Sequence, residues 1–409
     1  MINKLIGNPE LKSVIDAIER FDGSVRLVGG CVRDSIIGRE TTDVDLATDL
    51  VPETVLSALK AAKIKAVPTG ISHGTVTAIV RKTPYEITTL RSDTKCDGRH
   101  ASVVFTDSWL EDASRRDFTF NAMYCDKYGK IYDYFSGIQD LCDRRVNFIG
   151  DAEERINEDF LRILRVFRFH ASICSNSPLS NEIMNVCGKY AESLSRLSKE
   201  RIRSEFFKLL ACANCGNTLQ AMQECGVLSQ IVPYNLGISN VSSIHIALRR
   251  PITKLALMLR SGNEHVPVEE LTQGVTDLLR LSRKEKKILG LLLSTNIEFP
   301  INKVQQHKYL NLLDPETHKD VLIVNCLQNT TLPESILLEH LDYVSSLVHA
   351  RMPVSGKDLV DIGYPEGKFL GQALEILRGI WEKDPQNTSK EHLLRVARAL
   401  VEKPRAPVK

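Results

Sequence analysis

The stretch from Val25 to Asp49, VRLVGGCVRDSIIGRETTDVDLATD, constrains the fold more than any other part of this 409-residue chain. It opens with a short apolar run that is typical of a β-strand and that ends at Gly29 and Gly30. Glycines in such a turn let the backbone approach a ligand closely, because no Cβ stands in the way. Residues 31–38 then predict a short helix that carries Arg33, and a helix that begins on glycines offers backbone N–H groups to phosphate. The stretch therefore predicts a strand–turn–helix unit for phosphate, to which Arg33 adds a charged contact.

Two aspartates follow, Asp43 and Asp45, in the sequence DVDL. Side chains alternate along a strand, so the two carboxylates share one face while Val44 and Leu46 share the other. Two neighbouring carboxylates are suitable ligands for Mg²⁺. Taken singly, a Gly-Gly pair is commonly only a turn, and D-x-D is commonly a pair of solvated charges. In this order and spacing, however, the parts resemble the signature of the nucleotidyltransferase superfamily that includes DNA polymerase β, in which paired aspartates hold two metal ions.

Composition limits the class of protein. A chain of 409 residues predicts two to four domains, and 43% hydrophobic and 25% charged residues are typical of a globular protein. The net charge of +2 indicates that any RNA-binding surface is local. We find neither a signal-peptide core nor an apolar run long enough to span a bilayer. The ten cysteines include one C-x-x-C, at 212–215, without a second pair at zinc spacing. We therefore expect reduced, mostly buried thiols and a cytoplasmic protein.

The N-terminal part predicts a small mixed sheet with flanking helices. Residues 1–24 have the apolar spacing of one amphipathic helix, and 55–63 predict another. Three strands are expected at 65–68, 75–81 and 85–91. Glu86 lies on the last of these, either as a third carboxylate at the metal or as a charge at the sheet edge. Residues 92–112 are polar and predict a mobile loop with one short strand around 103–105.

A helix predicted over 157–169 carries charge on one half. Asp159, Arg162, Arg165 and Arg168 fall on that half, and apolar residues fall on the other. The charged face is either solvated or turned into a cleft. In a cleft, an aspartate and an arginine three residues apart on a helix are neighbours, and together they present an acceptor and donors to the edge of a base. The rest of the chain predicts helices. A basic patch at 196–208 is suited to RNA phosphate or is another solvated face.

Four blocks in this order and spacing resemble the class II tRNA nucleotidyltransferase family, which also includes bacterial poly(A) polymerases. They are LVGGCVRD with DVDLATD, RRDFTFNAMY, NEDFLRILRVFRFHA, and SKERIRSEFFKLL. The resemblance covers roughly residues 20–230. Later residues match only in helical character and in the looser pattern that begins with SGKDL.

The resemblance implies an α+β fold, in which a polymerase β-like head is followed by an all-α body and tail. It implies a catalytic head at 1–150 with a flexible loop at about 92–112, a nucleotide-recognition neck at 151–230, and a tRNA-binding body and tail at 231–409. Members add C, C and A to the tRNA 3′ end from CTP and ATP without a nucleic-acid template, and the loop is needed for the switch to ATP.

By the same resemblance, each candidate residue has an implied role. Asp43 and Asp45 hold Mg²⁺ and activate the 3′ hydroxyl. The implied nucleotide contacts are Gly29, Gly30, Arg33 and Arg116, then Asp159 and Arg162 as the amino-acid template, and Arg165 and Arg168 as support for that site and the triphosphate.

Three alternatives stay open at this point. Within the family they are a poly(A) polymerase, or a partial enzyme that adds only CC or only A. Outside the enzyme class, the alternative is a catalytically silent RNA-binding homologue. Some members carry a fused phosphohydrolase domain with adjacent His and Asp ligands, but here Leu341 separates His340 from Asp342, which argues against phosphatase activity. The expected partners are tRNA, CTP and ATP, with no membrane and no obligate protein partner.

Overall fold

The computed structural model describes residues 1–41, 43–94, 102–238, 241, 250–301, 305–306, 309, 313–328, 333–346, 352–381 and 388–402. The chain forms two compact units. The first consists of Met1–Pro251 and Gln273–Leu281, and the second of Ile252–Thr272 and Ser282–Lys409. The three-part division at about 150 and 230 stays a prediction.

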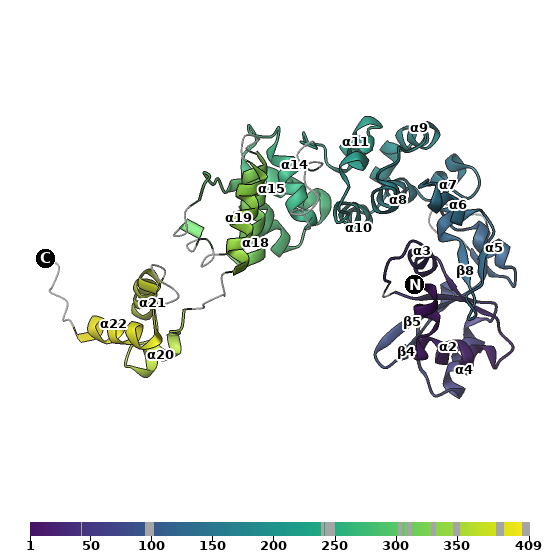
Figure 1. The fold of residues 1–409 in the computed structure, drawn as a ribbon, viewed down its shortest axis with the longest axis horizontal. Helices are drawn as coiled ribbons and strands as arrows, with labels where there is room; N and C mark the ends of the chain where they lie inside the picture. Colours follow the sequence, from purple (N-terminus) through teal and green to yellow (C-terminus); the bar gives the residue numbers. More distant parts are fainter. Residues whose placement is uncertain are drawn as a thin grey trace. The chain divides into compact units, whose positions relative to one another are not determined.

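A mixed sheet forms the N-terminal part of the first unit, as the sequence predicts (Figure 1). It has seven strands. Its strand order is β3-β4-β5-β2-β1-β8-β9, with β2 and β5 parallel and the other neighbours antiparallel. The strands are β1 (Val25–Val28), β2 (Asp45–Thr48), β3 (Lys65–Gly70), β4 (Thr75–Val80), β5 (Thr83–Thr89), β8 (Met123–Cys125) and β9 (Ile131–Asp133).

Helices α2 (Pro9–Glu19) and α4 (Pro52–Ala61) pack against each other and against this sheet. Leu11, Val14, Ile15 and Ile18 of α2 are buried, as expected. The single helix predicted for 1–24 is wrong, because a separate α1 (Ile2–Ile6) precedes α2. The Asn8 side chain accepts a hydrogen bond from the Glu10 N–H at 2.8 Å, and Pro9 occupies the first helical position. This local capping starts a new helix at residue 9.

The two aspartates stand at the start of the strand next to β1. Helix α3 (Gly30–Ile36) follows β1, and β2 begins at Asp45, so Asp43 precedes the strand that we predicted to contain both aspartates. The alternation nevertheless holds, because Val44 is 8% exposed and Leu46 is fully buried, whereas both aspartates are exposed.

The segment 92–112 is only partly the loop that we predicted. Strands β6 (Arg91–Thr94) and β7 (Ser102–Phe105) pair as an antiparallel hairpin, and α5 (Trp109–Ser114) begins within the segment. The Ser108 side chain caps α5 by accepting a hydrogen bond from the Glu111 N–H at 3.3 Å. Residues 95–101 lie outside the described residues, and the mobility predicted for them stays a prediction.

The helix predicted over 157–169 is interrupted. Helix α7 (Ala152–Glu158) ends before Asp159, whose backbone is extended at φ −154° and ψ 106°, and α8 (Leu161–Phe169) begins two residues later. The Asp159 side chain accepts a hydrogen bond from the Leu161 N–H at 3.1 Å, which satisfies a backbone donor at the start of α8. Asp159 and Arg162 are therefore not neighbours on one helix.

The remainder of the described chain is mainly helical, as predicted. In the first unit it includes α6 (Gly137–Cys142), a π-helical turn (His170–Cys174), α9 (Asn181–Lys189), α10 (Lys199–Leu210), α11 (Gly216–Glu224) and α12 (Val227–Ile231). The later helices are α14 (Pro251–Arg260), α15 (Val268–Leu279), α16 (Arg283–Ser294), α18 (Pro315–Gln328), α19 (Glu334–Ser346), α20 (Gly356–Asp361), α21 (Lys368–Trp381) and α22 (Lys390–Glu402).

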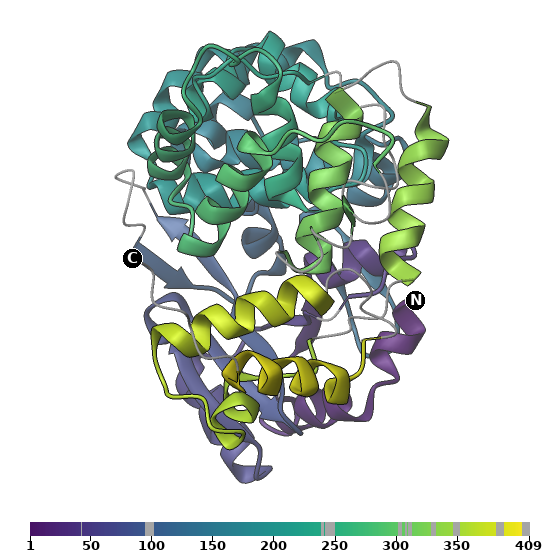
Figure 2. The same cartoon turned by 90° about the vertical axis from the view of Figure 1, so that its left-hand side faces the viewer.

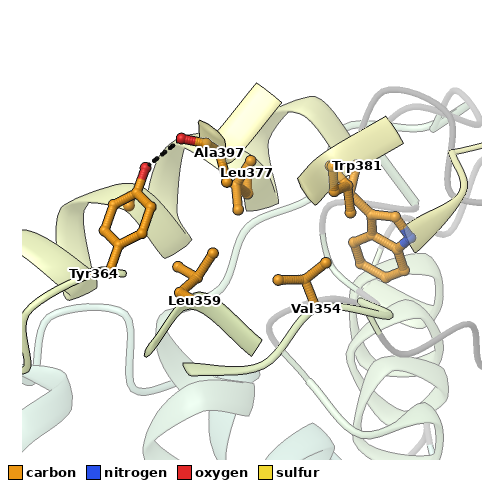
Figure 3. Packing of buried hydrophobic residues seen from close by; sticks show 8 residues of the cluster. Val354, Leu359, Tyr364, Leu377, Trp381 and Ala397 are labelled. Atoms are coloured by element: carbon orange, nitrogen blue, oxygen red, sulfur yellow. Dashed lines mark hydrogen bonds between the residues drawn. The ribbon is translucent and has the colours of Figure 1, made fainter. Parts of the chain in front are cut away.

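Helices α20, α21 and α22 lie side by side at the C-terminal end (Figures 1 and 2). They enclose a small core in which Leu359, Leu377 and Trp381 are buried (Figure 3). The Tyr364 hydroxyl donates a hydrogen bond to the Ala397 carbonyl at 2.8 Å across this core. The tail thus has an apolar core of its own.

None of the helices in the described part of the chain has the length and apolar character needed to cross a bilayer. All nine described cysteines are free thiols, and six of them are buried, as predicted.

Candidate active site

All ten candidate residues line one cavity of about 590 Å³ in the first unit. The head contributes the β1–α3 turn with the start of α3, the residues before and at the start of β2, and three residues from the segment 116–121. The helical part contributes residues around α8 and one residue of α10. The lining residues are Gly29, Gly30, Cys31, Arg33, Asp34, Thr41, Asp43, Asp45, Arg116, Asp117, Asn121, Asp159, Leu161, Arg162, Arg165, Arg168, Phe169 and Arg201.

The glycine turn forms one wall of the cavity. Gly29 has φ +72° and caps α3, a conformation that L side chains rarely adopt. A Cβ at this position would lie 3.6 Å from Nη1 of Arg116. The backbone of the turn is therefore open toward the cavity, with a guanidinium beside it.

The carboxylates of Asp43 and Asp45 form a second wall. Asp45 lies opposite Glu86 in the register of the parallel strands β2 and β5. Although Asp45 is exposed at the cavity wall, the surrounding protein partly desolvates its carboxylate and thereby raises its pKa. The negative charges of Glu86 and Asp43 raise this pKa further, against the opposing effect of Arg116. A divalent cation would relieve this crowding of negative charge, so the pair fits such an ion.

The prediction of a metal site depends on Asp43 and Asp45 alone. Across the described ranges, no three His, Cys, Asp or Glu side chains gather closely enough to hold a metal ion. A third carboxylate ligand from Glu86 stays a prediction.

Arg33 is held from two sides. Its Nε and Nη2 donate to the two carboxylate oxygens of Asp34 at 2.9 and 3.0 Å. Its Nη1 donates to Oδ1 of Asn121 at 2.6 Å. Such a bidentate pair fixes the plane of the guanidinium.

Arg165 and Arg168 of α8 also have acidic partners. Arg165 donates from Nε to Asp117 Oδ2 at 2.6 Å, and this pair joins the head to the helical part. Burial would raise the pKa of Asp117, but Arg165 and a hydrogen bond from Asn121 outweigh it and lower this pKa. Arg168 pairs with Glu205 of α10 at 2.5 Å, and Glu205 is only 5% exposed.

Asp159 and Arg162 reach the cavity from different local structures. The Asp159 carboxylate accepts a hydrogen bond from Arg201 of α10 at 2.8 Å. Arg162 pairs with Glu158 at the end of α7 and donates from Nη1 to the Arg155 carbonyl at 2.7 Å. The structure thus places an acceptor and a donor on the same cavity, although the helical spacing that we used to predict this was wrong.

Sequence reasoning missed several cavity residues, including Asp117, Asn121 and Arg201. In the block RRDFTFNAMY, Asp117 directly follows Arg116 and Asn121 lies four residues further on; their positions in that block were the available signal. Arg201 belongs to the basic patch at 196–208, for which RNA phosphate and solvent were the two interpretations. The structure adds a third role for this arginine, which is to donate a hydrogen bond to the Asp159 carboxylate.

Comparison with protein families gives two matches. Residues 25–147 match the model described as the poly A polymerase head domain. Residues 178–235 match the model described as the probable RNA and SrmB-binding site of polymerase A.

Known proteins match over most of the chain. It is 35% identical to "CCA tRNA nucleotidyltransferase 1, mitochondrial" of Danio rerio over 402 residues, which cover 94% of this chain and 89% of that protein. It is 38% identical to the CCA-adding enzyme of Leuconostoc citreum over 222 residues, which cover 54% of this chain and 53% of that protein. The crystal structure of the Bacillus stearothermophilus CCA-adding enzyme in complex with CTP aligns with a TM-score of 0.71 at 26% identity, covering 97% of this chain and 99% of that one.

Proposed function

The chain belongs to the family of CCA-adding tRNA nucleotidyltransferases, and from this premise we propose that it adds C, C and A to the 3′ end of tRNA from CTP and ATP without a nucleic-acid template. The observation that carries the proposal is the similarity to a CCA tRNA nucleotidyltransferase across 94% of this chain. A match to the head alone is equally compatible with a poly(A) polymerase, because the head model bears that name.

Enzymes of this family use divalent metal ions. We propose Mg²⁺, held by Asp43 and Asp45, because it prefers oxygen ligands. When bound, Mg²⁺ lowers the pKa of an attacking hydroxyl and neutralises charge on the triphosphate. Partial desolvation and then the charge of Glu86 raise the pKa of Asp45, and this carboxylate must be ionised to serve as a ligand.

The arginines supply the positioning that phosphoryl transfer needs. We assign the triphosphate to Arg33, Arg116, Arg165 and Arg168, all of which line the cavity. The open backbone at Gly29 lets phosphate oxygens approach closely. Paired acids preorganise these guanidinium groups, so little reorganisation is required when the nucleotide binds.

Asp159 and Arg162 fit the reading of a base. Cytosine and adenine both present an amino donor beside a ring-nitrogen acceptor on the Watson–Crick edge, whereas uracil and guanine present a carbonyl acceptor beside an N–H donor. A carboxylate only accepts and a guanidinium only donates. One aspartate and one arginine therefore complement C and A and mismatch U and G.

The test uses a tRNA transcript that lacks its last three nucleotides. With Mg²⁺, we expect two additions with CTP alone and a third, final addition when ATP is also present, read as product lengths on a gel. A long ladder with ATP alone would make the protein a poly(A) polymerase. An arrest after CC with both nucleotides, or addition of a single A only to a CC end, would make it a partial enzyme.

A result with no metal-dependent incorporation of CTP or ATP into any RNA would favour the silent RNA-binding homologue.

Chelation with EDTA followed by readdition of Mg²⁺, Mn²⁺ or Ca²⁺ shows which ion supports the reaction. Activity that survives complete chelation would contradict the metal assignment.

The compartment is a separate proposal. We propose the cytoplasm, on the basis of the free thiols of the described cysteines. The Danio rerio relative is named as a mitochondrial protein, so imaging of a C-terminally tagged chain in its own cells is the appropriate test. Signal confined to an organelle would overturn the proposal.

A further inference from the structure

A buried carboxylate outside the cavity wall holds one of its arginines. Asp112 of α5 is 1% exposed and does not line the cavity. An ionised carboxylate is costly to bury unless charge and hydrogen bonds compensate it. Its partners therefore indicate what it does.

Two arginines and one tyrosine share this carboxylate. Arg115 donates to Oδ1 from Nε at 2.9 Å and from Nη2 at 2.7 Å. Arg116 donates to Oδ2 from Nη2 at 2.9 Å and from Nε at 3.3 Å, and the Tyr124 hydroxyl donates to the same oxygen at 2.7 Å. Burial would raise the pKa of Asp112, but Arg116 and then Arg115 outweigh it and bring it to about 2. The group is therefore ionised at neutral pH.

Of these two arginines, Arg116 lines the cavity and Arg115 does not. Asp112 and Tyr124 engage Nε and Nη2 of Arg116. Within the described residues Nη1 has no hydrogen-bond partner, and it is the atom beside Gly29. Nε and Nη2 of the Arg116 guanidinium are thus held by Asp112 and Tyr124, while Nη1 is available at the glycine turn.

We propose that Asp112 is a positioning residue for nucleotide binding, which fixes the guanidinium of Arg116 so that Nη1 points at the place of the triphosphate. The inference rests on the proposed function, in which Arg116 contacts the triphosphate. A guanidinium held by two other bonds loses less conformational freedom when it binds phosphate. The same carboxylate holds Arg115, but that contact does not reach the cavity.

The test is the Asp112→Asn variant, measured for CTP and ATP in steady-state addition and for CTP in equilibrium binding. We expect KM and the CTP Kd to rise roughly tenfold, the size expected for one charge-assisted contact, with a smaller change in kcat. Arg115→Gln is the matched control, because Arg115 contacts the other oxygen of the same carboxylate and does not itself line the cavity. Its KM is expected to stay within about twofold of the parent value.

Combination with Arg116→Gln separates positioning from general damage. Because Asp112 acts through Arg116, the Asp112→Asn change should have little further effect on the CTP Kd in an Arg116→Gln background. Additive losses would overturn the proposal. If Asp112→Asn alone does not fold, the variant that combines it with Arg116→Gln removes both charges of the buried pair and is expected to recover stability. Tyr124→Phe is the second variant, because it weakens the contact between Asp112 and Arg116 and leaves the Asp112 carboxylate in place. A CTP Kd for Tyr124→Phe equal to that of the parent would then contradict the inference.

The outcomes distinguish this inference from the function on which it rests. An Arg116→Gln variant with unchanged CTP affinity would remove Arg116 from the nucleotide site, and the proposed function would have to be revised at that residue. Weakened binding in Arg116→Gln together with unchanged binding in Asp112→Asn would refute the role of Asp112 alone.

Discussion

The amide of Asn121 bridges two charged side chains in the cavity, and its exchange for a carboxylate is the sharpest perturbation that the structure offers. Asn121 accepts from Arg33 at 2.6 Å through Oδ1 and donates to Asp117 Oδ1 at 3.0 Å through Nδ2. The orientation of the amide is fixed, because arginine only donates and an ionised aspartate only accepts. Asn121→Asp keeps the shape and the contact with Arg33. It places a second carboxylate against Asp117.

The cost at neutral pH follows from burial, since Asn121 and Asp117 are each only 8% exposed. Loss of a buried hydrogen bond to a charged group, with repulsion added, is expected to lower the free energy of unfolding by about 2–3 kcal/mol. For a unit of this size, that corresponds to a decrease in Tm of roughly 4–12 °C.

The dependence on pH identifies the mechanism. Two adjacent carboxylates share a proton, so the folded variant has one pKa raised above the unfolded value of about 3.9. The folded state then binds a proton that the unfolded chain releases. The loss of stability is therefore smallest below about pH 4 and grows as the pH rises through the raised pKa. In the parent, burial raises the pKa of Asp117, but Arg165 and Asn121 lower it, so Asp117 stays ionised over this window.

The assay is thermal unfolding between pH 4 and pH 8 for the parent, Asn121→Asp and Asn121→Ala. The alanine variant loses both hydrogen bonds without gaining a charge, so its difference in Tm from the parent should stay nearly constant between pH 5 and pH 8. A deficit for Asn121→Asp that is equally flat would refute the argument from shared protons.

Further predictions concern the cavity and the tail. Asp43→Ala should abolish nucleotide addition while the Kd for tRNA, measured by filter binding, stays within about twofold of the parent; comparable loss of both would point to misfolding or to another role. Partial desolvation is the largest cause of the raised pKa of Asp45, and the negative charge of Glu86 is the next, so Glu86→Gln should move the acid limb of the pH–rate profile to lower pH; an unmoved limb would contradict this. Arg162→Ala should lower the preference for CTP over UTP, and for ATP over GTP, by about tenfold or more, with unchanged metal affinity; unchanged selectivity would remove α8 from base reading. Leu377→Ala, at a fully buried position of the tail core, should destabilise the tail by about 2–5 kcal/mol in chemical unfolding, and a loss below 1 kcal/mol would contradict the packing in Figure 3.

The parts of the site that the sequence predicted are those fixed by local chemistry. The β1–α3 turn depends on Gly29, whose positive φ is a property of the residue type, and the exposure of Asp43 and Asp45 follows from alternation with Val44 and Leu46. Strand β2 begins later than predicted, but the alternation survives this shift in the boundary.

The parts that the sequence did not predict depend on contacts between distant segments. No glycine or proline marks the break between α7 and α8, where Asp159 bonds to the Leu161 N–H and to Arg201, forty-two positions later. The pairing of Arg168 with Glu205 likewise spans two helices that only the folded chain brings together. Helical periodicity indicates which side chains share a face, and it says nothing about partners on another element.

Six arginines and five aspartates line the cavity, and these charges nearly cancel. A wall of balanced charge has little long-range field with which to attract an anion. Diffusional encounter between a nucleotide and this cavity should therefore depend only weakly on ionic strength, whereas contacts to an RNA backbone weaken steeply as salt is added. A salt titration can thus separate the two substrates of one enzyme, with the RNA released well before the nucleotide.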